Sequence, residues 1–278
     1  MSAIWQPKVW VAVLLGVIVQ PFAFLYLNKL ALFWLYLILV SIANLLDWRY
    51  QMHLGIIFMV VCPIHAYLFA KNNDAKTKRN WYSKWWGIPA IHAVIFSVVF
   101  LIRSFFYEPF SVPAASMSPS LEVGDVFIVK KLGFGGYGTY GLKLIDASLS
   151  DSIDLERGKM YAFFPPNLDV PFVKRLIGKP GDRANIKGNK VFVNDSLLKT
   201  SFVSEDHDFN FYNEVSDAQL YPIKTTEAGS PVENLVITVP EDNYFFLGDN
   251  RDNSADSRYW GTVPSTDFIG EVVYVFGK

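Results

Sequence analysis

One serine in this sequence has the surroundings of a nucleophile. Ser116 lies in a run of small residues between Pro113 and Pro119, and a run typical of a β-strand follows it. A constrained turn of small residues exposes the hydroxyl and lets another backbone approach it closely. A serine hydroxyl reacts well only when a neighbouring base removes its proton. The chemistry open to Ser116 therefore depends on which residue supplies that base.

Histidine is the usual base for a serine nucleophile, but none of the four histidines suits the role. His53, His65 and His92 lie in or beside apolar segments, where helix packing explains them. His207 lies in SEDHDFN, a polar stretch typical of a solvated loop. The sequence therefore gives no Ser/His/Asp triad with a well-placed base.

Neither a metal nor an organic cofactor is expected. The single cysteine, Cys62, lies in an apolar run, so no His/Cys set for zinc is available. GDNRDNSAD is acidic enough to suggest calcium, but it lacks the spacing of an EF-hand and contains Arg251. GFGGYG, residues 133–138, matches a dinucleotide-binding pattern, but no helix is expected after its third glycine. We interpret it as a loop between strands.

Lysine is the remaining candidate base, and Lys174 has a suitable context. A free lysine has a pKa near 10.4, but burial among apolar side chains can lower the pKa by several units. In the expected strand FVKRLI, residues 172–177, alternation places Lys174 on one face with Phe172 and Leu176, while Arg175 faces the other way. Desolvated there, Lys174 could act as a general base. Alternatively, it extends to water from a strand edge, and the pattern alone does not decide between these two interpretations.

A third polar stretch, FFLGDNRDNSADSRYWG, covers residues 245–261. It lies between two expected strands, and such loops often use their side chains only to stabilise turns. In the functional interpretation, Ser254 hydrogen-bonds the neutral amine of a lysine, while Asp256 pairs with Arg258 and braces the loop.

The elements that must position these residues are short strands. From residue 103 onward, runs rich in β-branched and aromatic residues are separated by Gly, Pro, Asn and Asp. This pattern predicts a mainly antiparallel β domain over residues 103–278, built as a barrel or as paired sheets. We interpret the polar stretch 204–230 as a surface excursion from it.

The first part of the chain predicts a membrane region. The whole sequence is 51% hydrophobic and 18% charged, too apolar for a purely soluble protein. Its apolar stretches have the length of a helix that crosses about 30 Å of hydrocarbon. Over residues 1–102 we expect four transmembrane helices, near 9–27, 30–46, 53–70 and 85–102. No cleavage site of the A-x-A type follows the first span, so a removable signal peptide is not expected.

The connector 71–84 sets the expected orientation. Its charged residues are Lys71, Lys76, Lys78, Arg79 and Lys84 against Asp74. A short basic loop favours the cytoplasmic side, which places residues 103–278 on the outer face. Membrane lipid is therefore an expected partner, whereas the net charge of −1 gives no reason to expect nucleic acid.

Three stretches together resemble the bacterial type I signal peptidases, also called leader peptidases. RSFFYEPFSVPAASMSPSLEVGDVFIVKK, FVKRLIGKPGD and GDNRDNSADSRYWG follow one another in that family's order, from residue 103 to residue 261. The resemblance implies a serine/lysine endopeptidase that removes signal peptides from exported precursor proteins. It also implies an all-β catalytic domain on the periplasmic or outer face of the bacterial cytoplasmic membrane.

The resemblance assigns a role to five residues by their position in these stretches. It implies that Ser116 is the nucleophile and Lys174 the general base. Ser254 matches the serine that orients the lysine, and Asp256 with Arg258 matches the supporting acidic and basic pair.

The substrate is expected to bind as an added strand beside the nucleophile. Phe110 and Val112 would line one side of that cleft and Val173 the other, with Pro113 and Met117 beside the nucleophile. Shallow apolar pockets there would select the small residues of an A-x-A cleavage site.

The sequence departs from the family pattern at three places. Ala114 stands where many relatives carry a serine that helps to hold the oxyanion, so we expect a slower enzyme that relies on the backbone N–H of Ser116. Lys159 replaces the acidic residue of an RGD-like turn. The apolar spans also exceed the one or two anchors that most members carry.

Two alternatives stay open at this point. One is a serine/lysine processing peptidase of narrower specificity, of a pilin or conjugation type. The other is a non-enzymatic, membrane-anchored β scaffold, although a scaffold has no physical need for a buried, unpaired lysine.

Overall fold

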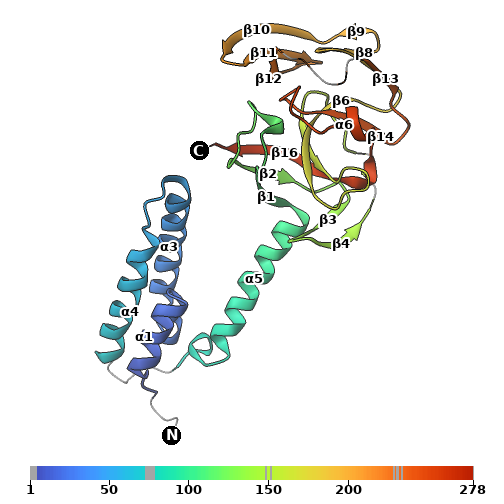
Figure 1. Ribbon diagram of the computed structural model, residues 1–278. Helices are drawn as coiled ribbons and strands as arrows, with labels where there is room; N and C mark the ends of the chain where they lie inside the picture. Colours follow the sequence, from blue (N-terminus) through green and yellow to red (C-terminus); the bar gives the residue numbers. More distant parts are fainter. Residues whose placement is uncertain are drawn as a thin grey trace. The chain divides into compact units, whose positions relative to one another are not determined.

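The computed structural model describes residues 5–72, 79–147, 149–150, 152–227, 229, 232 and 234–277. The chain divides into two compact units, Met1–Val98 and Val99–Lys278, and Figure 1 shows their elements. Helix α5, Gly87–Phe105, begins in the first unit and ends in the second.

The first unit consists of helices. They are α1 (Val9–Ile18), α2 (Phe22–Tyr26), α3 (Leu30–Tyr50), α4 (Gly55–Lys71), the short 3-10 helix Trp81–Ser83 and the beginning of α5. The stretch expected as one span at 9–27 is thus divided into α1 and α2. Gln20 adopts φ 41° and Pro21 follows it, a combination that ends one helix and starts another.

These helices pack closely through small and aromatic residues. A β-carbon on Gly16 of α1 would lie 2.7 Å from the Cα atom of Pro63 in α4, so only glycine allows this approach. The Tyr36 hydroxyl lies 2.7 Å from Nδ1 of His65, and His92 packs on Phe22 at 4.2 Å between ring centroids. His65 and His92 thus serve helix packing, as predicted.

Two of the helices are long and apolar enough to cross a membrane, α3 with 21 residues and α5 with 19. Only 17% and 6% of their apolar segments are buried within the protein, which is unlike the core helix of a soluble fold. α1 and α4 are shorter apolar helices. Residues 73–78, which include three charges of the basic connector, lie outside the described residues.

The second unit is mainly antiparallel β structure, as the sequence predicts. Its largest sheet has the strand order β1-β2-β16-β5-β6-β14-β15. These strands are β1 (Tyr107–Ser111), β2 (Val126–Lys130), β5 (Met160–Phe163), β6 (Phe172–Gly178), β14 (Asn243–Leu247), β15 (Val263–Pro264) and β16 (Phe268–Phe276).

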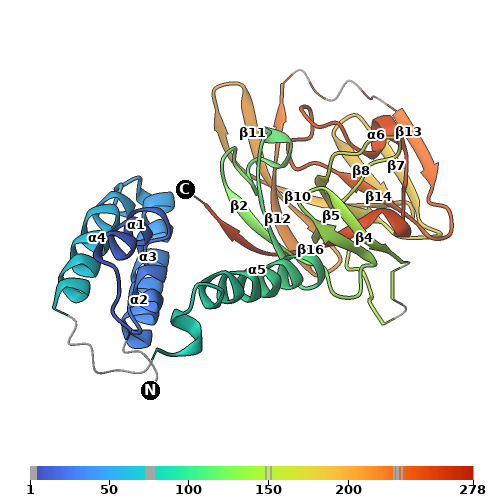
Figure 2. The same ribbon diagram turned by 90° about the horizontal axis from the view of Figure 1, so that it is seen from below.

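Three smaller sheets accompany it (Figure 2). One joins β13 (Asn234–Thr238), β7 (Arg183–Lys187), β8 (Lys190–Val193) and β9 (Ser196–Leu197). Another joins β10 (Lys199–Asp206), β11 (Phe209–Ser216) and β12 (Gln219–Thr226), and the hairpin of β3 (Gly136–Thr139) and β4 (Leu142–Asp146) forms the last. Helical turns at Ala115–Met117, Ser257–Trp260 (α6) and Ser265–Asp267 link the strands.

The polar stretch 204–230 differs from the expected surface excursion. Most of it belongs to the ordered sheet of β10, β11 and β12, in which Glu214 and Tyr221 are buried. Its buried residues include the polar Glu214 and Thr225 as well as Tyr221 and the apolar Ile223.

Aromatic packing holds the centre of the large sheet. Phe163 of β5 stacks on Phe246 of β14 at 4.4 Å between ring centroids, and Phe268 of β16 packs against both. All three side chains are fully buried. Because β6 pairs with β5 on one side and with β14 on the other, this cluster fixes the strand that carries Lys174.

Candidate active site

Two residues 58 positions apart meet beside the edge of the large sheet. Ser116 lies in the helical turn Ala115–Met117 after β1, and Lys174 lies in β6. The Nζ atom of Lys174 is 2.6 Å from the Oγ atom of Ser116. β1 is an edge strand and β6 is the fifth strand in the order, so the sheet must curve to bring the two together.

Lys174 is buried without a carboxylate partner. Its residue exposure is 3%, its Nζ atom lies 5.3 Å from the ring centroid of Phe172, and no salt bridge between described residues includes it. Desolvation lowers the pKa of Lys174 to about 8, although Asp256 and Asp249 act in the opposite direction. The alternative in which this lysine extends to water is wrong.

The lowered pKa makes the free base available near neutral pH. With a pKa of about 8, roughly one Lys174 amine in ten is neutral at pH 7. An ordinary lysine with a pKa near 10.4 would be neutral in only about one molecule in 2,500 at pH 7. The arrangement can therefore remove the proton of the Ser116 hydroxyl.

The loop after β14 holds the turn that carries Ser116. The backbone N–H of Asn250 donates to the carbonyl oxygen of Ser116 at 3.1 Å, and its side-chain amide donates to that of Ala115 at the same distance. A β-carbon on Gly248 would lie 2.5 Å from the Ser116 oxygen and 2.1 Å from Oγ of Ser254. Only glycine fits at that position.

Ser254 is buried beside this contact. Its Oγ atom makes no hydrogen bond within the described ranges, so the expected bond to the Lys174 amine is not formed here. An unpaired buried hydroxyl is costly, and such a group in a native fold calls for a functional explanation.

Asp256 and Arg258 form the ion pair expected from the sequence. Arg258 Nε donates to Asp256 Oδ1 at 2.8 Å, and the other carboxylate oxygen accepts from the backbone N–H of Gly248 at 2.9 Å. Asp256 also caps the N-terminus of α6. The pair thus ties α6 to the loop that touches Ser116.

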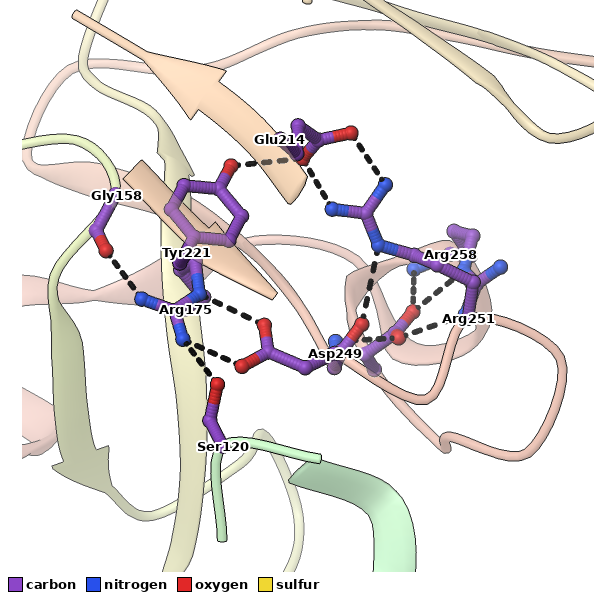
Figure 3. A network of polar contacts seen from close by, with 10 residues as sticks. Ser120, Gly158, Arg175, Glu214, Tyr221, Asp249, Arg251 and Arg258 are labelled. Atoms are coloured by element: carbon purple, nitrogen blue, oxygen red, sulfur yellow. Dashed lines mark hydrogen bonds and ion pairs between the residues drawn. The ribbon is translucent and has the colours of Figure 1, made fainter. Parts of the chain in front are cut away.

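Figure 3 shows two further buried ion pairs that sequence reasoning missed. Arg175, next to Lys174, points away from Ser116, as alternation predicts. Its Nε atom donates to Oδ1 of Asp249 at 2.7 Å, and its Nη2 atom donates to Oγ of Ser120 at 2.9 Å. This pair joins β6, the loop after β14 and the segment that follows the nucleophile.

The second pair links the loop to the sheet of β10, β11 and β12. Arg251 donates to the Glu214 carboxylate, with Nη1 2.9 Å from Oε2, and Tyr221 donates to the same carboxylate at 2.7 Å. Arg251 Nε also donates to the carbonyl oxygen of Gly248 at 3.2 Å. Because Glu214, Tyr221 and Arg251 are all buried, this sheet helps to fix the loop that holds Ser116.

Two backbone edges near Ser116, in β1 and in the first half of β6, are unpaired in the part of the chain that the structure describes, and we refer to the region between them as the groove. Among the described strands, β1 pairs with β2 alone. The first half of β6, residues 172–174, pairs with β5 on one side, while β14 pairs only with residues 175–178 on the other. An extended peptide could hydrogen-bond to either free edge.

Four of the five expected substrate-binding residues pack together beside this groove. Phe110, Val112, Met117 and Val173 belong to one apolar cluster, whereas Pro113 is exposed outside it.

Two positions depart from the family pattern in this unit. Ala114 is exposed, and Lys159 forms surface ion pairs with Glu156 and Glu271.

A model of the family described as signal peptidase, peptidase S26, matches residues 85–276. The chain belongs to this family. It is 32% identical over 196 residues to the signal peptidase I of Pseudomonas aeruginosa, covering 64% of this chain and 68% of the relative. It is 31% identical over 225 residues to that of Rickettsia akari, covering 74% and 83%. The resemblance seen in the sequence is thus confirmed.

Among solved structures, a signal peptidase I from Enterococcus faecalis V583 is 30% identical to this chain. The match covers 44% of this chain and 98% of that one, with a TM-score of 0.29. The family consists of signal peptidases, so this chain is a hydrolase that cleaves signal peptides. A non-enzymatic scaffold is not supported.

The first prediction concerns the close approach at Gly248. Gly248→Ala places a methyl group against the Ser116 carbonyl oxygen, so we expect kcat/KM for precursor cleavage to fall about 100-fold. Gly277→Ala is the matched control, because a β-carbon there meets only one atom, at an ordinary 3.7 Å. Cleavage by Gly248→Ala at the wild-type rate would contradict the described geometry.

The second prediction concerns the buried pair of Glu214 and Arg251. Glu214→Gln leaves the guanidinium buried without a counter-charge and should lower the free energy of unfolding by about 3–5 kcal/mol. Combining Glu214→Leu with Arg251→Met should cost less than Glu214→Gln, because no charge stays buried. Urea unfolding measures both, with the exposed Glu205→Gln of the same sheet as control. Equal stability of Glu214→Gln and Glu205→Gln would refute the role of the pair.

The third prediction follows from the burial of Lys174. Its folded pKa of about 8 lies below the value near 10.4 expected in the unfolded chain. The unfolded state therefore binds a proton that the folded state lacks, and stability falls by about 3 kcal/mol as pH decreases from 10.4 to 8. Below pH 8 this loss stays constant.

Lys174→Met removes this cost, so its unfolding temperature should exceed that of the wild type at pH 7 and approach it near pH 11. Lys199→Met, at an exposed lysine, serves as the control and should follow the wild type at both pH values. No stabilisation by Lys174→Met at pH 7 would show that the ammonium is solvated.

Proposed function

We propose that this enzyme cleaves signal peptides with Ser116 as nucleophile and Lys174 as general base, at the outer face of the bacterial cytoplasmic membrane. The observation that carries the proposal is the 2.6 Å contact between the Ser116 hydroxyl and a buried lysine amine. No other nucleophile in the described residues shows such a contact with a base of lowered pKa.

In the first half of the reaction, the neutral Lys174 amine takes the proton of the Ser116 hydroxyl. The Oγ atom attacks the scissile carbonyl carbon and forms a tetrahedral intermediate, whose oxyanion needs hydrogen-bond donors. Ala114 offers no hydroxyl, so the backbone N–H of Ser116 is the proposed donor. Collapse breaks the C–N bond, and the Lys174 ammonium donates its proton to the departing amine.

In the second half, the acyl group on Ser116 Oγ is transferred to water. Lys174, again neutral, takes one proton of that water, whose oxygen attacks the ester carbonyl. Collapse of this intermediate returns the proton to Ser116 and releases the signal peptide with a free carboxylate. The lysine thus alternates between acid and base, and the enzyme ends in its starting state.

Ser254 is proposed to orient the lysine. Its buried hydroxyl lacks a partner in the described part of the chain, and it lies next to the Gly248–Ser116 contact. Donation from this hydroxyl to the neutral amine would fix the rotamer of Lys174. Asp256 and Arg258 support the arrangement by holding the loop in place.

Signal-peptide-bearing precursors are the proposed substrates, and their extended cleavage region is proposed to lie between the free edges of β1 and β6. The apolar cluster with Val112 and Met117 lies beside Ser116 and is proposed to accept only small side chains, which suits an A-x-A site. A bulkier residue would have to displace buried side chains.

Four membrane spans near 9–27, 30–46, 53–70 and 85–102 are proposed to anchor the enzyme in the bilayer, with the connector 71–84 in the cytoplasm. The lengths and exposed apolar surfaces of α3 and α5 support this placement. β1 begins at Tyr107, directly after α5 ends at Phe105, so the groove starts close to the end of a proposed span. The apolar segment of a signal peptide would lie in the same layer.

The fourth prediction tests this function with the full chain in detergent and a precursor that carries an A-x-A site. The wild type should cut after that site, and kcat/KM should rise with pH through an apparent pKa of about 8, where Lys174 becomes neutral. Ser116→Ala and Lys174→Ala should lose at least about 1000-fold in rate.

The exposed residues Ser196 and Lys199 supply matched controls, and Ser196→Ala and Lys199→Ala should cleave normally. Activity of Ser116→Ala at the wild-type level would contradict the assignment. Cleavage of pilin-type precursors alone would favour the enzyme of narrower specificity.

A further inference from the structure

A cavity of about 630 Å³ lies beyond Phe110, at the end of the groove away from Ser116. Neither Ser116 nor Lys174 lines it. Its walls come from β1, the hairpin of β3 and β4, the segment before β6, and the residues around the start of β16. Its volume is within the range typical of ligand pockets, about 300–1,000 Å³.

The cavity continues both sides of the proposed substrate groove. On one side Pro109 precedes Phe110 in β1, and on the other Pro171 precedes Phe172 at the start of β6. Phe110 lines the cavity and also belongs to the apolar cluster that contains Val112. A peptide that fills the groove would therefore extend directly past the cavity.

Alternation along β1 places the cavity on a defined face of the groove. Glu108, Phe110 and Val112 are two residues apart, so their side chains point to the same face of the strand. Phe110 and Val112 would contact the small residues of the cleavage site, and Glu108 lines the cavity. The cavity therefore lies at the next position along this face of β1, beyond Phe110.

The buried charge in this wall is neutralised by its neighbours. The Glu108 carboxylate lies 2.8 Å from Lys131 Nζ and 3.2 Å from Arg103 Nη2, and it accepts a hydrogen bond from Thr139 Oγ1. Arg103 is in the last turns of α5 and also donates to Thr139 at 3.3 Å, which places the hairpin beside the end of α5 (Figure 1). This wall therefore offers no unpaired charge to a ligand.

The remaining lining favours an apolar ligand over an acidic one. Phe110, Phe164 and Ile145 contribute apolar surface. Three carboxylates, Asp146, Asp169 and Asp267, also line the cavity, together with the ammonium of Lys143, which lies 4.9 Å from the ring centroid of Phe164. An apolar side chain would move from water onto the apolar surfaces. A carboxylate would instead be desolvated near these three carboxylates and one ammonium, that of Lys143.

We propose that this cavity binds the side chain of the fifth residue before the scissile bond and selects an apolar residue there. The proposal rests on the proposed function, in which the substrate lies along β1 with its scissile carbonyl at Ser116. The first and third residues before the cut then face Val112 and Phe110, and the fifth faces the cavity beside Glu108.

The test uses the full chain in detergent with three precursors that share one A-x-A site and differ only at the fifth residue before the cut, which is Leu, Ala or Asp. The wild type should prefer Leu to Asp by about tenfold or more in kcat/KM. Ile145→Lys places an ammonium in the cavity wall and should lower this Leu/Asp ratio about tenfold. A ratio measured within one variant is insensitive to partial loss of folded enzyme.

Leu144→Lys is the matched control, because Leu144 is the neighbouring residue on β4, is similarly exposed and does not line the cavity. It should keep the wild-type ratio. A wild type that cleaves all three precursors at equal kcat/KM would overturn the inference, and so would equal ratios in Ile145→Lys and Leu144→Lys.

Two further outcomes separate the possible failures. A wild type that cleaves none of the three precursors would contradict the proposed function itself, rather than the role of the cavity alone. An effect of Ile145→Lys that is the same for all three precursors in phosphatidylethanolamine–phosphatidylglycerol vesicles, and absent in detergent, would assign the cavity to lipid and overturn the inference.

Discussion

A buried lysine amine of lowered pKa beside a serine hydroxyl is the arrangement on which the rest of this structure depends. A lysine amine becomes a base near neutral pH only when water and counter-charges are kept away from it. Lys174 meets this condition at 3% exposure, in a strand that pairs with β5 along residues 172–175 and with β14 from residue 175 onward. The curved sheet then brings Ser116, from the opposite edge, to within 2.6 Å of the amine.

The two carboxylates that act on this lysine each form an ion pair with an arginine. Asp249 and Asp256 both act to raise the pKa of Lys174. Asp249 forms an ion pair with Arg175, and Asp256 forms one with Arg258. Both arginines also hold the loop after β14, which carries the residues that contact the backbone of Ser116. The ion pairs thus do two things: they occupy charges that would otherwise stabilise the ammonium, and they fix the geometry of the nucleophile.

The sequence was sufficient to predict the proposed catalytic residues, but it did not predict the buried ion pairs that hold their surroundings in place. Short motifs predicted the proximity of Ser116 and Lys174, because the proposed nucleophile and base leave local signals such as a small-residue turn and a lysine between apolar neighbours. The pairing of Glu214 with Arg251 was missed, since its partners are 37 positions apart and a polar strand looks like a solvated surface. The break of the first apolar stretch at Gln20 depended on one backbone angle, and the cavity beyond Phe110 depends on tertiary packing.

The central claim is tested most directly by titrating Lys174 itself. In the full chain with ¹⁵Nζ-labelled lysine, the Lys174 amine can be assigned by its loss in Lys174→Arg and followed by NMR from about pH 6 to pH 11. The account predicts a midpoint near 8, set by burial. A midpoint near the ordinary lysine value of about 10.4 would show that the amine is charged throughout the working range, and Lys174 could then not be the base.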